Sequence, residues 1–173
     1  MAIGEHVARW TRASGHQSCR DTLRPCVDNI DDLRAGLDGD AAAAAIESLW
    51  TGNLVVARRE IEALRLADPA AWRWQALEAD LLRDEGQHDE AIERYQRLAA
   101  DHRDTRHEPV LVQHLGKAQF AAGRYVDAAA SFRCALELRL ADSAPEALVA
   151  SSKRALERAS ELAEGDSRPR GAG

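Results

Sequence analysis

Three segments of the chain share a pattern in which a glycine ends a helical run of apolar residues and an alanine follows five residues later. The three pairs are Gly52 with Ala57, Gly86 with Ala91, and Gly123 with Ala128. The glycines recur about every 35 residues, and a period of roughly 20–50 residues is typical of stacked supersecondary units. This repeat constrains the fold more than the composition does.

Each position of the pattern has a physical reason. Glycine adopts the left-handed conformation that ends a helix, and alanine lets two helices approach closely where they cross. A large side chain follows each alanine by one helical turn: Ile61, Tyr95 and Phe132. Such a residue fills the space between one helix pair and the next. A single pair cannot bury its apolar faces, whereas stacked pairs can, so the pattern predicts an all-α solenoid.

These residues resemble the tetratricopeptide repeat. The third unit matches best, and its matching residues are Leu115, Gly116, Gly123, Arg124, Tyr125, Ala128, Phe132 and Ala135. This unit and the helix after it are also similar to segments of actinobacterial tetratricopeptide proteins of unassigned function. The resemblance implies a right-handed α-solenoid of about three helix pairs, with units near 38–71, 72–105 and 109–142. The sequence departs from the family pattern at Leu140, where the third unit would carry a closing proline.

The apolar periodicity and the turn residues predict a helix for each half of a unit. The expected ranges are 40–51, 54–67, 70–84, 88–101, 108–122 and 125–140. Ser143 and Glu146 have the spacing of a capping box, so we expect a capping helix over 144–164 and a disordered tail over 165–173. Residues 1–37 are expected to form an N-terminal cap or a mobile arm, with short helices near 4–13 and 27–36 and a loop between them.

The charge and the hydropathy limit the classes of partner. The formal net charge is -6 and the isoelectric point is near 5.5, which argues against direct binding of nucleic acid. No apolar run has the length that crosses a bilayer, and the N-terminal residues lack the apolar core of a secretion signal. We therefore expect a cytoplasmic protein that does not bind membranes.

No residue pattern in the chain predicts catalysis or a bound metal. The sequence lacks the nucleophile-elbow, phosphate-loop and dinucleotide motifs, so we expect no enzymatic activity and no cofactor. His102, His107 and Glu108 lie in or near a loop and His114 lies on the next helix, without a zinc-binding spacing, and we interpret this group as solvated residues rather than as a metal site. The three cysteines are interpreted as reduced thiols, with Cys134 packed inside its helix pair.

The family resemblance implies that the first helix of each pair lines a concave groove. Carried over to this chain, the partner-binding residues would be Ile46, Leu49, Trp50, Arg73, Asp80, Arg83, Gln113, Lys117 and Phe120. This wall is apolar at one end and charged in the middle, which suits an apolar helix or an extended peptide with mixed charges beside it. The alternative interpretation is that the charged residues are simply solvated surface.

The repeat, the charge and the groove residues lead to three hypotheses for the function. The first is a non-catalytic interaction module, an adaptor or scaffold that binds a protein or peptide in the groove. The second is a self-associating structural protein, a homo-oligomer, in which residues 1–37 fill the groove of the same chain or of a neighbour. The third is a regulatory sensor module that acts beside a DNA-binding or catalytic partner.

Overall fold

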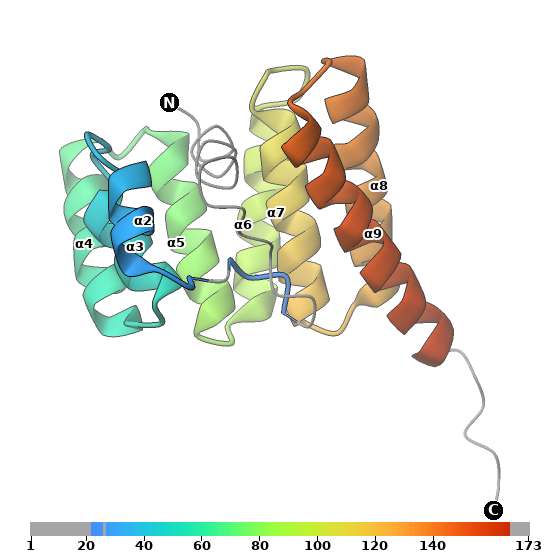
Figure 1. Ribbon diagram of the computed structural model, residues 1–173, viewed down its shortest axis with the longest axis horizontal. Helices are drawn as coiled ribbons and strands as arrows, with labels where there is room; N and C mark the ends of the chain where they lie inside the picture. Colours follow the sequence, from blue (N-terminus) through green and yellow to red (C-terminus); the bar gives the residue numbers. More distant parts are fainter. Residues whose placement is uncertain (1–21, 26, 167–173) are drawn as a thin grey trace, which may run out of the picture.

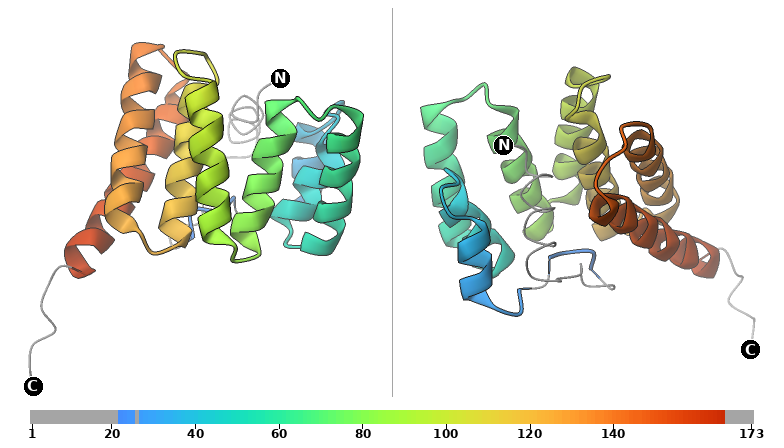
Figure 2. Two further views of the ribbon diagram at one scale, coloured as in Figure 1. Left: turned by 180° about the vertical axis from the view of Figure 1, so that it is seen from behind. Right: turned by 45° about the horizontal axis from the view of Figure 1, so that its top comes forward.

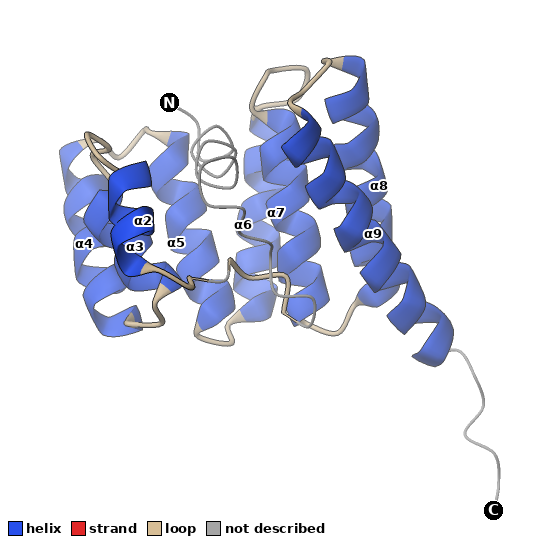
Figure 3. Cartoon of the chain, viewed as in Figure 1, coloured by secondary structure: helices blue, strands red, loops and turns tan. Residues whose placement is uncertain are grey.

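The computed structural model describes residues 22–25 and 27–166, and within these ranges it is all-α, with eight helices and no strand (Figure 3). The helices are α2 (Ile30–Gly36), α3 (Ala43–Trp50), α4 (Leu54–Ala67), α5 (Trp72–Asp84), α6 (His88–Asp101), α7 (Glu108–Ala121), α8 (Tyr125–Ala141) and α9 (Glu146–Asp166). None of these helices is long and apolar enough to cross a membrane.

The helices pack in chain order, each against the next (Figure 1). Tight turns join α3 to α4, α5 to α6 and α7 to α8, which makes three helical hairpins. Helix α5 also contacts α7 directly, α2 packs on α3, and α9 packs on α8. The hairpins follow one another along an arc, whose inner side we call the concave face (Figure 2).

The three hairpin turns confirm the role expected of their glycines. Gly52, Gly86 and Gly123 have φ angles of 80°, 84° and 74°, in the left-handed region that glycine adopts without a steric penalty. At each turn the glycine and the residue after it donate their N–H groups back to carbonyls of the preceding helix. In the second turn the nitrogen of Gly86 lies 3.1 Å from the carbonyl oxygen of Arg83, and the nitrogen of Gln87 lies 2.8 Å from that of Leu82. This is the Schellman arrangement, which satisfies the last carbonyls of a helix.

The contacts between the helices also follow the repeated pattern. Ala57, Ala91 and Ala128 are each fully buried. The large residues one turn later, including Tyr95 and Phe132, are buried as well. The apolar interior forms two clusters, one spanning α2 to α7 and a smaller one shared by α7, α8 and α9.

The observed helices lie within three residues of the expected ranges at every end. The short helix expected over 27–36 is α2, and the capping helix is α9, which extends to Asp166. The role predicted for Ser143 is wrong. It has a φ of 52° and donates its N–H to Leu140, so it closes α8 rather than starting α9. The helix expected over 4–13 and residues 167–173 of the tail lie outside the described residues.

The prediction of a packed thiol at Cys134 is also wrong, because this side chain is exposed. Phe132 and Ala135 are fully buried, but successive residues of a helix point about 100° apart, since a turn contains 3.6 residues. Cys134 therefore faces solvent between two positions that face the interior. Cys19 and Cys26 lie outside the described residues.

Candidate partner-binding site

The segment from Thr22 to Pro25 lies on the concave face, between α2 and α9 (Figure 2). Its leucine, Leu23, is 4% exposed and belongs to the apolar cluster that includes Phe120 of α7, Phe132 of α8 and Ala155 of α9. Leu23 has a φ of 54°, a left-handed conformation that is strained for a residue with a side chain. The helices therefore hold this short stretch of irregular backbone by burying one aliphatic side chain.

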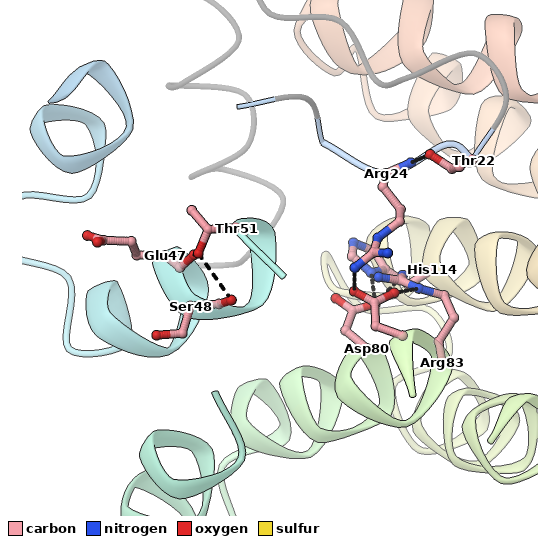
Figure 4. A network of polar contacts seen from close by, with 9 residues as sticks. Thr22, Arg24, Glu47, Ser48, Thr51, Asp80, Arg83 and His114 are labelled. Atoms are coloured by element: carbon pink, nitrogen blue, oxygen red, sulfur yellow. Dashed lines mark hydrogen bonds and ion pairs between the residues drawn. The ribbon is translucent and has the colours of Figure 1, made fainter. Parts of the chain in front are cut away.

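The next residue, Arg24, joins the segment to α5 through an ion pair. Its Nη2 donates to Asp84 Oδ2 at 2.6 Å, and the Asp84 side chain is only 4% exposed. The other oxygen of Asp84 accepts from Nε of Arg83 at 2.8 Å. Arg83 in turn donates through Nη1 to Asp80 at 2.5 Å. Figure 4 shows Arg24 reaching from the segment toward Asp80 and Arg83 on α5.

His114 of α7 continues this polar network into the interior. Its Nδ1 lies 3.0 Å from Asp80 Oδ1 and 3.3 Å from the hydroxyl of Tyr95, which donates to the carbonyl of Ala76. Burial alone would raise the pKa of Asp80, but the attraction of Arg83 and the hydrogen bond with His114 outweigh it and hold that pKa well below its ordinary value. Because Asp80 is ionised, we assign the proton of His114 to Nδ1, which donates to the carboxylate.

The histidine side chain itself stays neutral. Burial lowers the pKa of His114, and the attraction of Asp80 offsets this only in part. The interpretation of His114 as a solvated residue is wrong, because its side chain is buried on α7. His102 and His107 are half-buried around Trp72, with ring centroids 5.8 Å and 4.5 Å from its ring. Over residues 22–25 and 27–166, no group of histidine, cysteine or acidic side chains is placed to hold a metal ion.

Two further cations lie beside this network. Burial lowers the pKa of Lys117 to about 8, with nearby guanidinium groups adding to the effect. Burial also lowers the pKa of Arg139 to about 10. The Nη1 of Arg139 donates to three neutral oxygens, those of the Gln113 amide, the Ser152 hydroxyl and the Leu148 carbonyl. Arg139 thus ties α8 to both α7 and α9.

A pocket of about 370 Å³ opens next to the segment. Its walls include Thr22 and Arg24 of the segment, Asp84 of α5, and the aromatic residues Phe120 and Tyr125. The two aromatic rings lie 5.3 Å apart, edge to face. The segment therefore occupies only part of the concave surface around Asp84.

The structure divides the expected groove residues into two sets. At the α3 end, Ile46 and Leu49 are 2% and 0% exposed, in the same apolar cluster as Leu33 of α2 and Leu37, which directly follows α2. Trp50 packs against this cluster and is partly buried. These apolar side chains are covered by α2, so in this structure they do not form an open surface.

The charged set lies nearer to the segment. Arg73 stands apart, because it pairs with Asp40 and its guanidinium lies 5.2 Å from the Trp74 ring. The other expected residues, Asp80, Arg83, Gln113, Lys117 and Phe120, are buried or half-buried in the network and cluster described above. The charges of Asp80 and Arg83 are therefore paired inside the protein, and Lys117 is half-buried beside them rather than part of a solvated surface.

Sequence reasoning missed the residues that bind the concave face from within the chain. Leu23 and Arg24 fall in a stretch that reads as a loop, without periodicity or capping residues. An isolated leucine in a polar loop, followed by a basic residue, is the only local signal.

Scans against family models and searches of curated proteins and solved structures gave no match to the chain.

Proposed function

We propose that this chain is a tetratricopeptide-type repeat protein that binds another protein through its concave face, as a non-catalytic adaptor or scaffold in the cytoplasm. In this proposal the three hairpins are tetratricopeptide units stacked in a right-handed solenoid, and α9 caps the stack. The glycine turns, the buried alanines and the stacking of hairpins in chain order support the assignment.

The observation that carries the proposal is the seating of residues 22–25. Burial of Leu23 and the ion pair from Arg24 to Asp84 are contacts that a peptide from another protein would make equally well. Recognition of a peptide in a helical groove uses such anchors, an apolar side chain in a recess and a charged side chain at its edge. The concave face therefore has the chemistry of a peptide-binding surface.

A photo-crosslinking experiment tests this proposal. A benzoylphenylalanine residue replaces Ala121, which is exposed and lines the pocket beside the segment, and the protein is irradiated in source-cell extract. The matched control carries the same residue at Val55 of α4, which is 84% exposed. A protein adduct formed from position 121 and absent from position 55 is expected. Equal labelling from both positions, or none from position 121, contradicts the proposal.

The same observation favours a second candidate, self-association by exchange of the N-terminal segment. A segment held by one leucine and one ion pair can seat in a neighbouring copy as readily as in its own chain. Light scattering over a range of protein concentrations distinguishes the candidates. If the segment is exchanged, the mass is expected to rise from monomer to dimer with concentration, and Arg24→Glu is expected to return it to monomer. A monomer at every concentration contradicts exchange.

A further inference from the structure

The concave face has an apolar recess that depends on Leu23 for its cover. Leu23 is 4% exposed, and Phe120, in the same cluster, is 5% exposed. Removing the segment would open this recess to water, which is unfavourable for apolar surface. Any segment that replaces residues 22–25 must therefore bring an aliphatic side chain of similar size to the same place.

The position next to the recess selects for positive charge. Asp84 accepts from Arg83 through Oδ1 and from Arg24 through Oδ2. The side chain of Arg83 is only 8% exposed and already binds both Asp80 and Asp84. Oδ2 of Asp84 is thus the atom with which a basic side chain from outside the helices would pair. That basic residue would directly follow the aliphatic residue in the bound segment.

The chain's own segment is a replaceable occupant of this site. Leu23 holds a strained left-handed backbone conformation, and the Arg24 side chain remains 40% exposed. Residues 22–25 do not fill the adjoining pocket of about 370 Å³, which has Phe120 and Tyr125 in its walls. A longer segment with an unstrained backbone gains contacts there that residues 22–25 do not make.

From these three observations we propose that the concave face recognises an extended segment of a partner protein in which an aliphatic residue is followed directly by arginine or lysine. Thr22–Pro25 occupies this site until the partner displaces it. The proposal rests on the proposed function and names the chemistry of the partner. The recess around Phe120 selects the aliphatic residue, and Asp84 selects the basic one.

Selection from a random dodecapeptide phage library tests it on the full chain. The bait carries Leu23→Ser and Arg24→Glu, which unseat the segment; Arg24→Glu alone is the second bait if circular dichroism shows that the double variant has lost helix. Enriched peptides are expected to contain an aliphatic residue followed by arginine or lysine. By fluorescence anisotropy they are expected to bind the unseated protein at least tenfold more tightly than the wild type, in which residues 22–25 compete.

Charge reversal provides the specificity control. For this control the bait carries Leu23→Ser and Asp84→Lys and keeps Arg24, which the new lysine repels, and the selected residue after the aliphatic one is expected to change from basic to acidic. Enrichment of peptides without the aliphatic–basic pair overturns this inference and leaves the proposed function standing. A failure to enrich any peptide, together with no adduct from position 121, overturns both. Equal affinity for the wild-type and unseated proteins refutes the displacement of residues 22–25.

Discussion

Gly116 of α7 lies where a helix residue closely approaches α8. A Cβ atom added there would lie 2.6 Å and 2.7 Å from two ring carbons of Phe132. The ring cannot move aside easily, because Phe132 is fully buried. Overpacking of this kind costs about 1–3 kcal/mol, while replacing a helical glycine by alanine returns about 0.5–1 kcal/mol. Because these contacts are closer than ordinary Cβ contacts, the upper part of the overpacking range applies, about 2–3 kcal/mol. After a return of about 1 kcal/mol, Gly116→Ala is expected to lower the free energy of unfolding by about 1–2 kcal/mol.

Thermal and urea unfolding followed by circular dichroism measure this effect. For a domain of this size the loss corresponds to a fall in Tm of about 2–8 °C. Gly165→Ala is the matched control, because its Cβ would meet nothing within 4 Å. It gains the helix propensity without the contact, so its stability is expected to stay equal or rise slightly. Comparing the two variants isolates the steric cost.

A double variant tests whether the ring is the cause. Phe132→Leu removes Cε1 and Cζ, two of the three ring carbons that the new Cβ would meet, and replaces the rigid ring by a side chain that can rotate away. Gly116→Ala is therefore expected to cost less in that background than in the wild type. An equal cost in both backgrounds would place the strain elsewhere. Unchanged stability of Gly116→Ala itself would refute the close approach of α7 and α8.

Three other substitutions test the polar network and the turns. Lys117→Met is expected to raise stability at pH 7, because the buried charge is removed. The wild type is expected to gain stability between about pH 8 and 10.5, where the unfolded chain keeps the Lys117 proton that the folded chain has lost, and the variant is expected to lack this gain. Urea midpoints measured against pH test both expectations. His114→Gln is expected to reduce the loss of stability below pH 6.5, because the unfolded chain protonates His114 before the folded one does. Gly86→Ala, at a φ of 84°, is expected to cost about 1–2 kcal/mol in urea unfolding.

The helices and their turns could be predicted from the sequence because the signals are local. A glycine such as Gly86 ends a helix through its own backbone conformation, and the apolar spacing after it determines which face is buried. Burial of Ala91 and Tyr95 follows from the same spacing. The repeat therefore contains most of the information that the all-α fold requires.

The site could be predicted less well, because its residues come together only through packing. Helix α7 is buried on most of its circumference, so its sequence has no polar face that would indicate which way His114 points. The seating of Leu23 depends on α7, α8 and α9 together. Similarly, the cover that α2 places over Ile46 and Leu49 depends on how α2 packs on α3.

If the concave face recognises a peptide as proposed above, its paired charges have a role there that their contribution to stability does not supply. Buried ion pairs such as Asp80 with Arg83 often contribute no more to folding than apolar side chains of the same volume would, because both ions lose their hydration. What such pairs do is fix the direction of each donor and acceptor. In this network Arg83 and His114 hold Asp80, and Arg83 orients Asp84 so that one carboxylate oxygen meets Arg24. In the proposed complex, a carboxylate positioned in this way beside an apolar recess would discriminate between peptides by both charge and register, which a purely apolar groove cannot do.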